Sequence, residues 1–452
     1  MHSFFAHILA ACAISRKNKK MKNFSILVFL SLSFHVAGQS YTSYFTGNPT
    51  DTVTVPLGGV CLMGGATENN EAMKWFLKRA NGGDILVLRT SGSDGYNNYL
   101  FYTLGIPVHS VETIVFNSSS ASNNAYIQQK ISNAEAIWFA GGDQWDYISY
   151  WRNTPVEFLV NNAIQNRKIA VGGTSAGMAI LGGFYFSAQN GTVTSAAALA
   201  NPYNSKVTVD SALFIRNNYL QDVITDTHYD NPDRKGRQVA FLARIYTDFG
   251  IAAKGIACDE YTAVCIDTSG LAKVYGKYPT NDDNAYFIQP NCELSSTTPE
   301  NCSPATPLDW NLSQKALKVY KINGTNAGVN TFNLNDWTSG SGGVWEHWYV
   351  NNGVLNETAG TQINCAPLSV DNANLSGINI YPNPCRENLR IETNQHVIYG
   401  IEIINISGVI IETRTGLNNT VALIDVNTLR SGLYFVLVQT DDKMYYRKFL
   451  KE

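Results

Sequence analysis

Charged side chains are scarce in this sequence of 452 residues: they make up 15% of the chain and leave a net charge of −3. Without a basic excess, nothing in the composition points to nucleic acid as a partner. The apolar run FSILVFLSLSF at 24–34 is too short to span a bilayer. The spacings of the eight cysteines do not resemble a zinc site. These absences leave a globular protein, and its length favours two or more domains.

The first 38 residues are predicted to be a leader and signal peptide. A basic cluster from Arg16 to Lys22 precedes the apolar run, and Val36 and Gly38 occupy the small-residue positions before a cleavage site. We expect the mature chain to begin near Gln39. A retained membrane anchor is the alternative, and the shortness of the apolar run disfavours it.

Seven cysteines remain in the expected mature chain. Cys292 and Cys302 flank a polar loop, which makes them the best candidates for a disulfide in an oxidising compartment. Cys61, Cys258 and Cys265 lie in apolar runs and are predicted to be buried thiols.

Residues 53–183 alternate short apolar runs with helix-like segments. Apolar strands that end in Gly, Ser or Asp and alternate with helices predict a parallel sheet covered on both faces. Binding sites gather at the carboxyl ends of such strands. Three glycine-rich strand ends qualify: MGGA at 63–66, AGGDQ at 140–144 and GGTSAG at 172–177. We expect residues 250–350 to complete the same sheet and to add a β-rich extension.

The segment GGTSAG has the features of a nucleophile elbow. Ser175 lies within G-x-S-x-G, between Gly173 and Gly177, with a strand-like run before it and a helix-like run after it. Small neighbours allow a tight turn that pushes the serine hydroxyl into solvent, and free N–H groups of the following helix would face the site. A phosphate-binding turn or simple close packing are the alternatives.

A nucleophilic serine needs a base, and His228 is the candidate. It stands at a polar strand end, after Asp226 and before Arg234 and Arg237. Glu260 lies in an apolar run, where a carboxylate is costly unless paired, so we expect it to orient the imidazole. The alternatives are an ordinary surface histidine and an ion pair between Glu260 and an arginine.

Four segments occur in the order found in one peptidase family: AGGDQ, GTSAG, DTHYDNPDRKGR at 226–237 and GIACDEYTAV at 255–264. Over about 55–350 the sequence resembles the serine peptidases that include cyanophycinase and dipeptidase E, and it is closer to the cyanophycinase branch. The resemblance implies an α/β flavodoxin-like sandwich related to class I glutamine amidotransferases. It also implies Ser175 as nucleophile, His228 as base and Glu260 as the third member, with no metal or cofactor required.

The resemblance further implies how the reaction would be assisted. The loop at Gly142 and Asp143, with the backbone of Ala176, would form the oxyanion hole. Gln144 would contact the substrate.

Two departures from cyanophycinases concern the substrate. The sequence reads Asp226-Thr227-His228 where Asp-Gln-His is usual, and Pro232 replaces the first of three arginines, whereas Arg234 and Arg237 remain. We expect these two arginines, with Asp226, to bind substrate and to favour acidic, aspartyl residues on the acyl side of the bond. The alternative is that the arginines pair with Glu260 or Asp226 and only stabilise the site.

The C-terminal residues 377–452 are predicted to form a separate small antiparallel β-sandwich after a polar linker at 359–376. YPNP at 381–384, SGLYFV at 431–436 and YYRKFLKE at 445–452 resemble the C-terminal sorting domain of type IX secretion substrates. That resemblance implies a secreted or cell-surface protein with the type IX secretion machinery as a partner. A generic adhesive sandwich is the alternative.

Together these features predict a secreted serine peptidase, with its peptidase domain at 39–358, that hydrolyses peptide or isopeptide bonds next to aspartyl residues. A catalytically degenerate surface-binding protein is one alternative. An esterase with the same elbow is another, although its acid would precede its histidine in the chain. A homodimer is an assembly that the sequence leaves open.

Overall fold

The computed structural model describes residues 39–210, 214–364, 378–393, 396–405, 410–440 and 444–452. The predicted signal peptide at 1–38 and most of the predicted linker, at 365–376, lie outside these residues. No helix in the described part of the chain is both long enough and apolar enough to cross a membrane.

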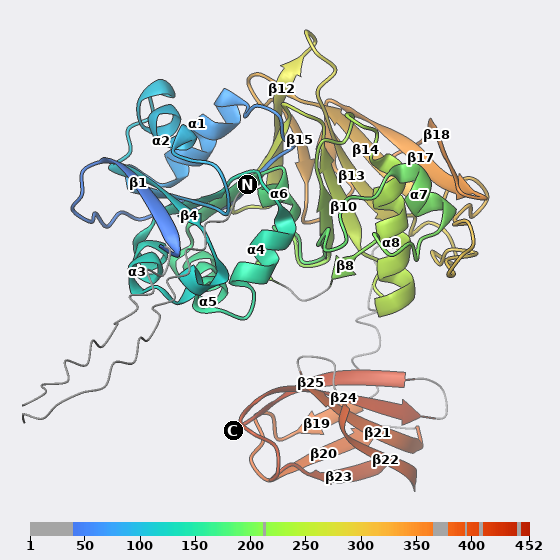
Figure 1. The fold of residues 1–452 in the computed structure, drawn as a ribbon. Helices are drawn as coiled ribbons and strands as arrows, with labels where there is room; N and C mark the ends of the chain where they lie inside the picture. Colours follow the sequence, from blue (N-terminus) through green and yellow to red (C-terminus); the bar gives the residue numbers. More distant parts are fainter. Residues whose placement is uncertain (1–38, 211–213, 365–377, 394–395, 406–409, 441–443) are drawn as a thin grey trace, which may run out of the picture.

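A ten-stranded sheet, called sheet A, organises the N-terminal part, in the order β1-β4-β3-β5-β6-β2-β11-β12-β15-β16 (Figure 1). Its strands are β1 (Tyr41–Gly47), β2 (Gly59–Met63), β3 (Asp84–Arg89), β4 (Ser110–Phe116), β5 (Ala136–Phe139), β6 (Ala170–Thr174), β11 (Ala263–Ile266), β12 (Leu271–Tyr278), β15 (Asn330–Asn333) and β16 (Gly340–Ser341). The five strands from β4 to β2 are parallel. Antiparallel β1 and β11 flank them.

Helices cover both faces of the parallel strands. They are α1 (Asn70–Arg79), α2 (Gly95–Asn98), α3 (Ala125–Asn133), α4 (Gln144–Trp151) and α5 (Pro155–Asn162). Successive residues of a strand point to opposite faces. Leu86 and Leu88 of β3 therefore join the core formed with α3, α4 and α5, whereas Ile85 and Val87 join the core formed with α1. Figure 1 shows α1 and α2 on one side of β4, and α3 and α5 on the other.

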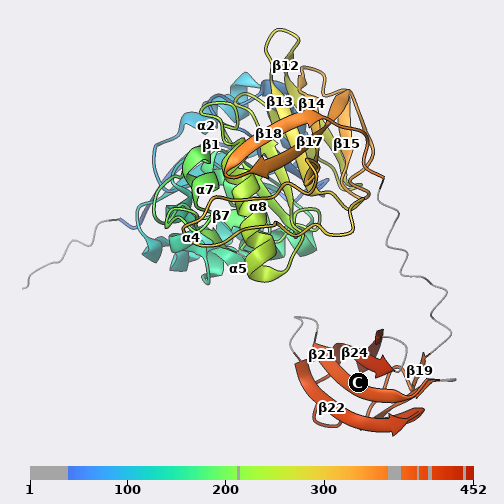
Figure 2. The same cartoon turned by 90° about the vertical axis from the view of Figure 1, so that its right-hand side faces the viewer.

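A second sheet, sheet B, has six strands in the order β18-β17-β14-β13-β10-β9. They are β9 (Val223–Asp226), β10 (Lys254–Cys258), β13 (Asn284–Pro290), β14 (Leu317–Asn323), β17 (Gly343–Asn351) and β18 (Val354–Ala359). Helices α7 (Ser195–Ala200) and α8 (Lys235–Phe249) lie against it (Figure 2). The expectation that residues 250–350 complete the same sheet and add a β-rich extension agrees with these strands. Strands β11, β12, β15 and β16 extend sheet A, whereas β10, β13, β14 and β17 belong to sheet B.

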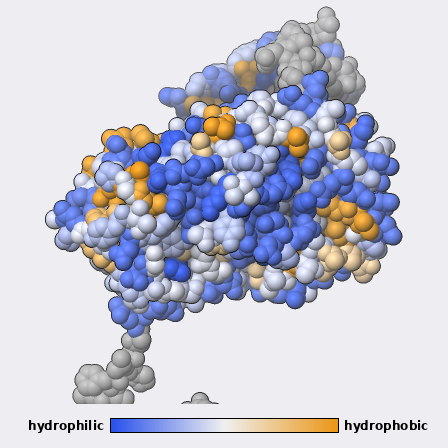
Figure 3. Space-filling model, turned by 90° about the horizontal axis from the view of Figure 1, so that it is seen from above, coloured by the Kyte–Doolittle hydropathy of each residue, from blue (hydrophilic) through white to orange (hydrophobic). Residues whose placement is uncertain are grey.

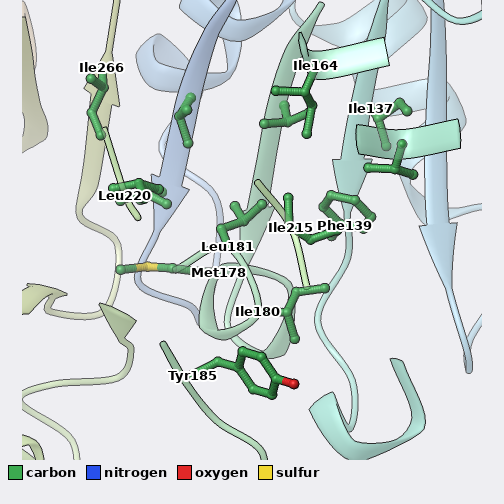
Figure 4. Close-up of a cluster of buried hydrophobic side chains, with 14 of the residues drawn as sticks. Ile137, Phe139, Ile164, Met178, Ile180, Leu181, Tyr185, Ile215, Leu220 and Ile266 are labelled. Carbon is green, nitrogen blue, oxygen red and sulfur yellow. The ribbon is translucent and has the colours of Figure 1, made fainter. Parts of the chain in front are cut away.

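The segment after β6 lies in the main hydrophobic core. Helix α6 (Ala176–Ala179) is only one turn long, shorter than the sequence pattern suggests. Met178, Ile180 and Leu181 are fully buried, and Figure 4 shows them among side chains of β5 and β11. This packing fixes the backbone on one side of Ser175. The face of the molecule in Figure 3 is mainly hydrophilic, with apolar patches toward its ends.

The folded body extends beyond the predicted boundary at residue 358. Ile363 is buried. The buried Lys318 ammonium donates to the Thr361 carbonyl over 3.0 Å, and the Asn364 N–H donates to Glu293 over 2.7 Å. Residues 359–364, which the sequence predicted to be linker, are therefore part of the packed body.

The C-terminal strands form two sheets that share one core. The three-stranded sheet has β19 (Ile378–Tyr381), β20 (Asn388–Thr393) and β23 (Val421–Asp425), and the four-stranded sheet has β21 (Ile398–Asn405), β22 (Ile410–Asn419), β24 (Gly432–Thr440) and β25 (Met444–Lys451). All seven pair antiparallel. Ile391, Ile403 and Val438 contribute to the shared core. This is the small antiparallel sandwich that the sequence predicts.

The predicted disulfide between Cys292 and Cys302 is wrong. Cys302 is a free, buried thiol, whereas Cys292 is disulfide-bonded. Cys302 packs in the core beneath α8, and burial raises its pKa. The sequence suggested that both cysteines flank one polar loop, but the Cys302 end of this loop is packed in the core. Cys61, Cys258 and Cys265 are buried, as predicted, and none of the three is disulfide-bonded in this structure.

Candidate active site

The turn after β6 exposes one hydroxyl. Ser175 has φ 51° and ψ −117°, a conformation that costs energy for a residue with a Cβ. A Cβ on Gly173 would collide with the backbone of Gly177, so the flanking glycines allow the sharp turn. From residue 170 to residue 180 Ser175 alone is half-buried, whereas the others are buried. The geometry is that of a strained strand-to-helix elbow.

His228 reaches Ser175 from sheet B. It follows the end of β9 by two residues and also has a positive φ, 48°. Its Nε2 lies 2.9 Å from the Ser175 Oγ, and its N–H donates to the carbonyl of Gly64 over 2.7 Å. Gly65, with φ 119°, lies against the imidazole so closely that a Cβ would collide with Nε2.

Glu260 completes a row of three side chains in contact, Ser175, His228 and Glu260. Its Oε1 lies 2.6 Å from the Nδ1 of His228, so a proton on Nδ1 would be held there and Nε2 would be free to accept from Ser175. Its second carboxylate oxygen accepts a long hydrogen bond from Asn231, 3.4 Å, and its N–H donates to the Asp230 carboxylate over 2.8 Å.

The placement of Glu260 differs from the expectation of an acid inside one apolar strand. The segment forms two strands, β10 in sheet B and β11 in sheet A, and Glu260 lies in the four-residue turn between them. A half-buried carboxylate in a turn avoids the desolvation cost that a position within a buried strand would carry.

Three predicted oxyanion donors lie at the same place. Gly142 and Asp143, at the turn between β5 and α4, line one cavity with Ser175 and Ala176. The Ser175 N–H donates to the Met63 carbonyl over 3.2 Å and is therefore occupied. In the described part of the chain, no hydrogen bond is found for the N–H groups of Gly142, Asp143 or Ala176. They are available to a ligand.

The cavity beside Ser175 has a volume of about 380 Å³. Gln144 lines it and donates a long hydrogen bond, 3.4 Å, to the Phe186 carbonyl. Asp146, on the first turn of α4, also lines it, and burial, followed by the charge of Asp143, raises its pKa. Two cationic side chains, Arg234 and Arg237, line it as well.

Arg237 and Asp226 pair with each other. The Arg237 guanidinium donates to both carboxylate oxygens of Asp226, over 2.8 and 2.5 Å, and both side chains are about 4% exposed. The third guanidinium nitrogen donates to Thr192 and to the Val193 carbonyl. All the nitrogens of this guanidinium thus have partners. For Arg237, this matches the alternative in which the arginine pairs with Asp226 and stabilises the site.

Arg234 differs from Arg237. It donates to the Thr227 carbonyl over 3.0 Å. Among the described residues no carboxylate forms an ion pair with it. Burial, and then the charge of Arg237, lowers its pKa. A guanidinium that lines a cavity without a paired anion is a ready partner for a substrate carboxylate.

Some residues of the site were not assigned from the sequence. Met63, Gly64 and Gly65 anchor the backbone of Ser175, His228 and Tyr261 through their carbonyl groups. MGGA is recognisable as a glycine-rich strand end, but its partners come from distant segments that no local pattern shows. In the described part of the chain, no group of three or more His, Cys, Asp or Glu side chains could hold a metal.

Comparisons with known proteins find two similarities. About half of the chain is similar to proteins named cyanophycinases. Residues 379–452 match the family described as the secretion system C-terminal sorting domain. Both resemblances derived from the motifs are confirmed, and the sorting domain supports a secreted or cell-surface location.

The relatives are distant. The chain is 24% identical over 228 residues to the cyanophycinase of Synechococcus elongatus, covering 49% of this chain and 66% of that protein. It is 23% identical over 167 residues to the cyanophycinase of Trichormus variabilis, covering 37% and 51%. The chain thus spans less than two thirds of the length of these relatives.

Solved structures show a partial likeness. A peptidase from an acI-B1 actinobacterium aligns with a TM-score of 0.39 and 15% identity, covering 51% of this chain and 91% of that one. A putative peptidase E protein from Listeria monocytogenes aligns with a TM-score of 0.32 and 16% identity, covering 49% and 98%.

Proposed function

We propose that this protein is a secreted serine-type peptidase that hydrolyses peptide or isopeptide bonds next to aspartyl residues. The observation that carries the proposal is the continuous row from the Ser175 hydroxyl through His228 to Glu260, with separations of 2.9 and 2.6 Å. The row starts at a strained elbow beside a cavity. Strain of this kind is typical of functional sites.

The mechanism is acyl transfer. Ser175 Oγ attacks the scissile carbonyl carbon while its proton passes to His228 Nε2, and Glu260 stabilises the imidazolium that forms. The N–H groups of Ala176 and of the Gly142–Asp143 turn hold the oxyanion. The proton then passes from His228 to the leaving amine. Water, deprotonated by the same imidazole, releases the acyl group and regenerates Ser175.

The substrate preference rests on Arg234. We propose that its unpaired guanidinium binds the free carboxylate of an aspartyl residue whose other carboxyl group, α or β, forms the scissile bond. Arg237 and Asp226 act together as a buried pair that holds the cavity wall, and Gln144 contacts the substrate from α4. The relatives' name suggests cyanophycin as a substrate to test, but Thr227 and Pro232 depart from their usual pattern.

A serine-reactive phosphonate tests the chemistry first. We expect it to label the wild-type protein at Ser175 and to leave Ser175→Ala unlabelled. Incubation with a β-linked Asp-Arg dipeptide polymer and, separately, with an α-linked acidic peptide library then identifies the bond from product masses. An unlabelled, inactive wild-type protein would favour the surface-binding alternative.

The chain order disfavours the esterase alternative. In α/β-hydrolases the acid precedes the histidine, whereas here Glu260 follows His228. The strand order supports a flavodoxin-like classification, because β4-β3-β5-β6 corresponds to 2-1-3-4 when β3 is taken as the first strand.

Export would begin with the signal peptide at 1–38 and continue through the type IX machinery, which would recognise the sorting domain. N-terminal sequencing of the secreted protein tests cleavage before Gln39. Sedimentation of the purified chain tests the homodimer.

A further inference from the structure

Two cysteines outside the candidate active site lie side by side in the core. Cys61 of β2 and Cys265 of β11 are direct partners in the antiparallel strand pair, and their Sγ atoms are 3.6 Å apart. Their exposed fractions are 0% and 1%. Both belong to the core formed with α1. The proposed mechanism uses neither thiol.

We propose that Cys61 and Cys265 form a cross-strand disulfide in the exported protein. Directly opposite residues of an antiparallel pair have Cα atoms about 4.5 or 5.5 Å apart, and both values fall within the range of about 4.4–6.8 Å that a disulfide accepts. An S–S bond of about 2.05 Å requires the two sulfurs to approach by about 1.5 Å. Rotation about the two Cα–Cβ bonds would bring the sulfurs together while the strands keep the register that pairs these residues.

Two features of the chain indicate an oxidising environment. Cys292 is disulfide-bonded, and residues 379–452 are a sorting domain for secretion. Disulfides form and persist in extracytoplasmic compartments. In the reaction two S–H bonds are replaced by one S–S bond. Two protons are released and two electrons reduce a low-molecular-weight disulfide, or the disulfide of an oxidoreductase, to two thiols.

The two thiols would be oxidised during folding, before α1 covers Cys61 and Cys265. Met73, Phe76 and Leu77 of α1 pack in the same core as the two cysteines, so an oxidant cannot reach them in the finished fold. Burial raises the pKa of Cys265, which suppresses the reactive thiolate once the fold is complete.

The bond would join two strands that hold the candidate active site. Two and three residues after Cys61, the carbonyls of Met63 and Gly64 accept the N–H groups of Ser175 and His228. On the other strand, β11 begins directly after the turn that carries Glu260. A covalent link would therefore stabilise the backbone on which the row of side chains depends.

A peptide map of the full chain tests the bond. The protein is folded with a mixture of oxidised and reduced glutathione, denatured without reductant, alkylated and digested. Cys258 and Cys265 fall between the same two lysines, so cleavage after Glu260 is needed to separate them. We expect a linked pair of peptides containing Cys61 and Cys265, and alkylated Cys258. Alkylation of both Cys61 and Cys265, or a link between Cys61 and Cys258, would overturn the proposal.

Matched variants give a second readout. Cys258 lies nearby, with its Sγ 3.8 Å from the Leu62 carbonyl, and serves as the control. Reduction should lower the melting temperature of wild type and of Cys258→Ala by several degrees more than that of Cys265→Ala, because only the first two lose the Cys61–Cys265 link. Reduction also breaks the disulfide of Cys292 in all three proteins, so that loss does not affect the comparison. Equal shifts in the three proteins would contradict the proposal, and if Cys265→Ala does not fold, the peptide map decides alone.

Discussion

Two groups of side chains at the candidate active site are held in different ways. In the first group, Ser175 and His228 have strained backbone and donate their N–H groups to the carbonyls of Met63 and Gly64, and Glu260 contacts His228. In the second group, one arginine is fixed in a buried ion pair and the other is unpaired. Chemistry requires one fixed geometry, whereas binding can vary with the substrate. The first group therefore tolerates fewer changes than the second.

Removal of the nucleophile should have the largest effect. Ser175→Ala is expected to lower kcat/KM by several orders of magnitude, because the acyl-enzyme cannot form. Circular dichroism and melting temperature should stay close to wild type, since the side chain is only half-buried and the change removes a single oxygen atom. Turnover near the wild-type rate would exclude Ser175 as the nucleophile.

A collision with the imidazole of His228 should lower the activity less than loss of the nucleophile does. Gly65→Ala places a methyl group against His228 Nε2, and we expect a loss of about 100-fold in kcat, the size of effect caused by a misplacement of about 1 Å.

Gly82→Ala is the matched control for this variant. Its φ is also positive, 82°, but no atom lies within 4 Å of its new Cβ. It therefore reproduces the backbone strain without the collision. Equal losses of activity in the two variants would show that strain, and not contact with His228, is responsible.

A change in the second group should lower the stability of the fold before it affects catalysis. Arg237→Met leaves the Asp226 carboxylate buried and unpaired, which should cost about 3–5 kcal/mol in the free energy of unfolding. Chemical denaturation measures this loss. The double variant Arg237→Met with Asp226→Asn should recover part of it, because the uncompensated charge is gone. No recovery would argue against the buried pair.

The unpaired arginine should affect binding alone. Arg234→Lys is expected to raise KM for acidic peptides about tenfold, because an ammonium cannot bind a carboxylate bidentately. The melting temperature and the activity on neutral peptides should change little. Equal losses on both kinds of peptide would show that Arg234 is structural.

The smallest effect concerns pH. Burial, and then the charge of Asp230, raises the pKa of Asp259 from 3.8 to about 7. The folded state therefore binds the Asp259 proton more tightly than the unfolded state, and this stabilisation is complete below about pH 4 and is lost as the pH rises through 7.

Asp259→Asn removes this titration. Between pH 5 and pH 8 the melting temperature of wild type should fall relative to that of the variant. Glu135, whose pKa burial also raises to about 7, titrates in both proteins and does not affect the comparison. Parallel pH curves would contradict the assignment.

Local patterns predicted much of this molecule. Glycines around a single serine indicated the elbow at Ser175, and small residues after apolar runs indicated the parallel strands. The recurrent strand and turn signals after residue 377 indicated the C-terminal sandwich. These patterns are local because they reflect backbone geometry and the period of side-chain burial. His228 was a candidate because of its setting at a polar strand end, and Glu260 because a carboxylate in an apolar run is costly unless paired. The structure places His228 against Ser175 and Glu260 against His228.

The partners of those residues came from the tertiary structure alone. The sequence did not show that the chain passes from sheet B to sheet A at Glu260. It did not show that Asp226 pairs with Arg237 and leaves Arg234 unpaired. Nor did it show that Cys302 is buried in the core or that Cys61 contacts Cys265. These contacts join residues that are up to about two hundred positions apart. Side-chain period and turn chemistry act over a few residues, so they determine which elements form, whereas the packing of whole sheets decides which side chains meet.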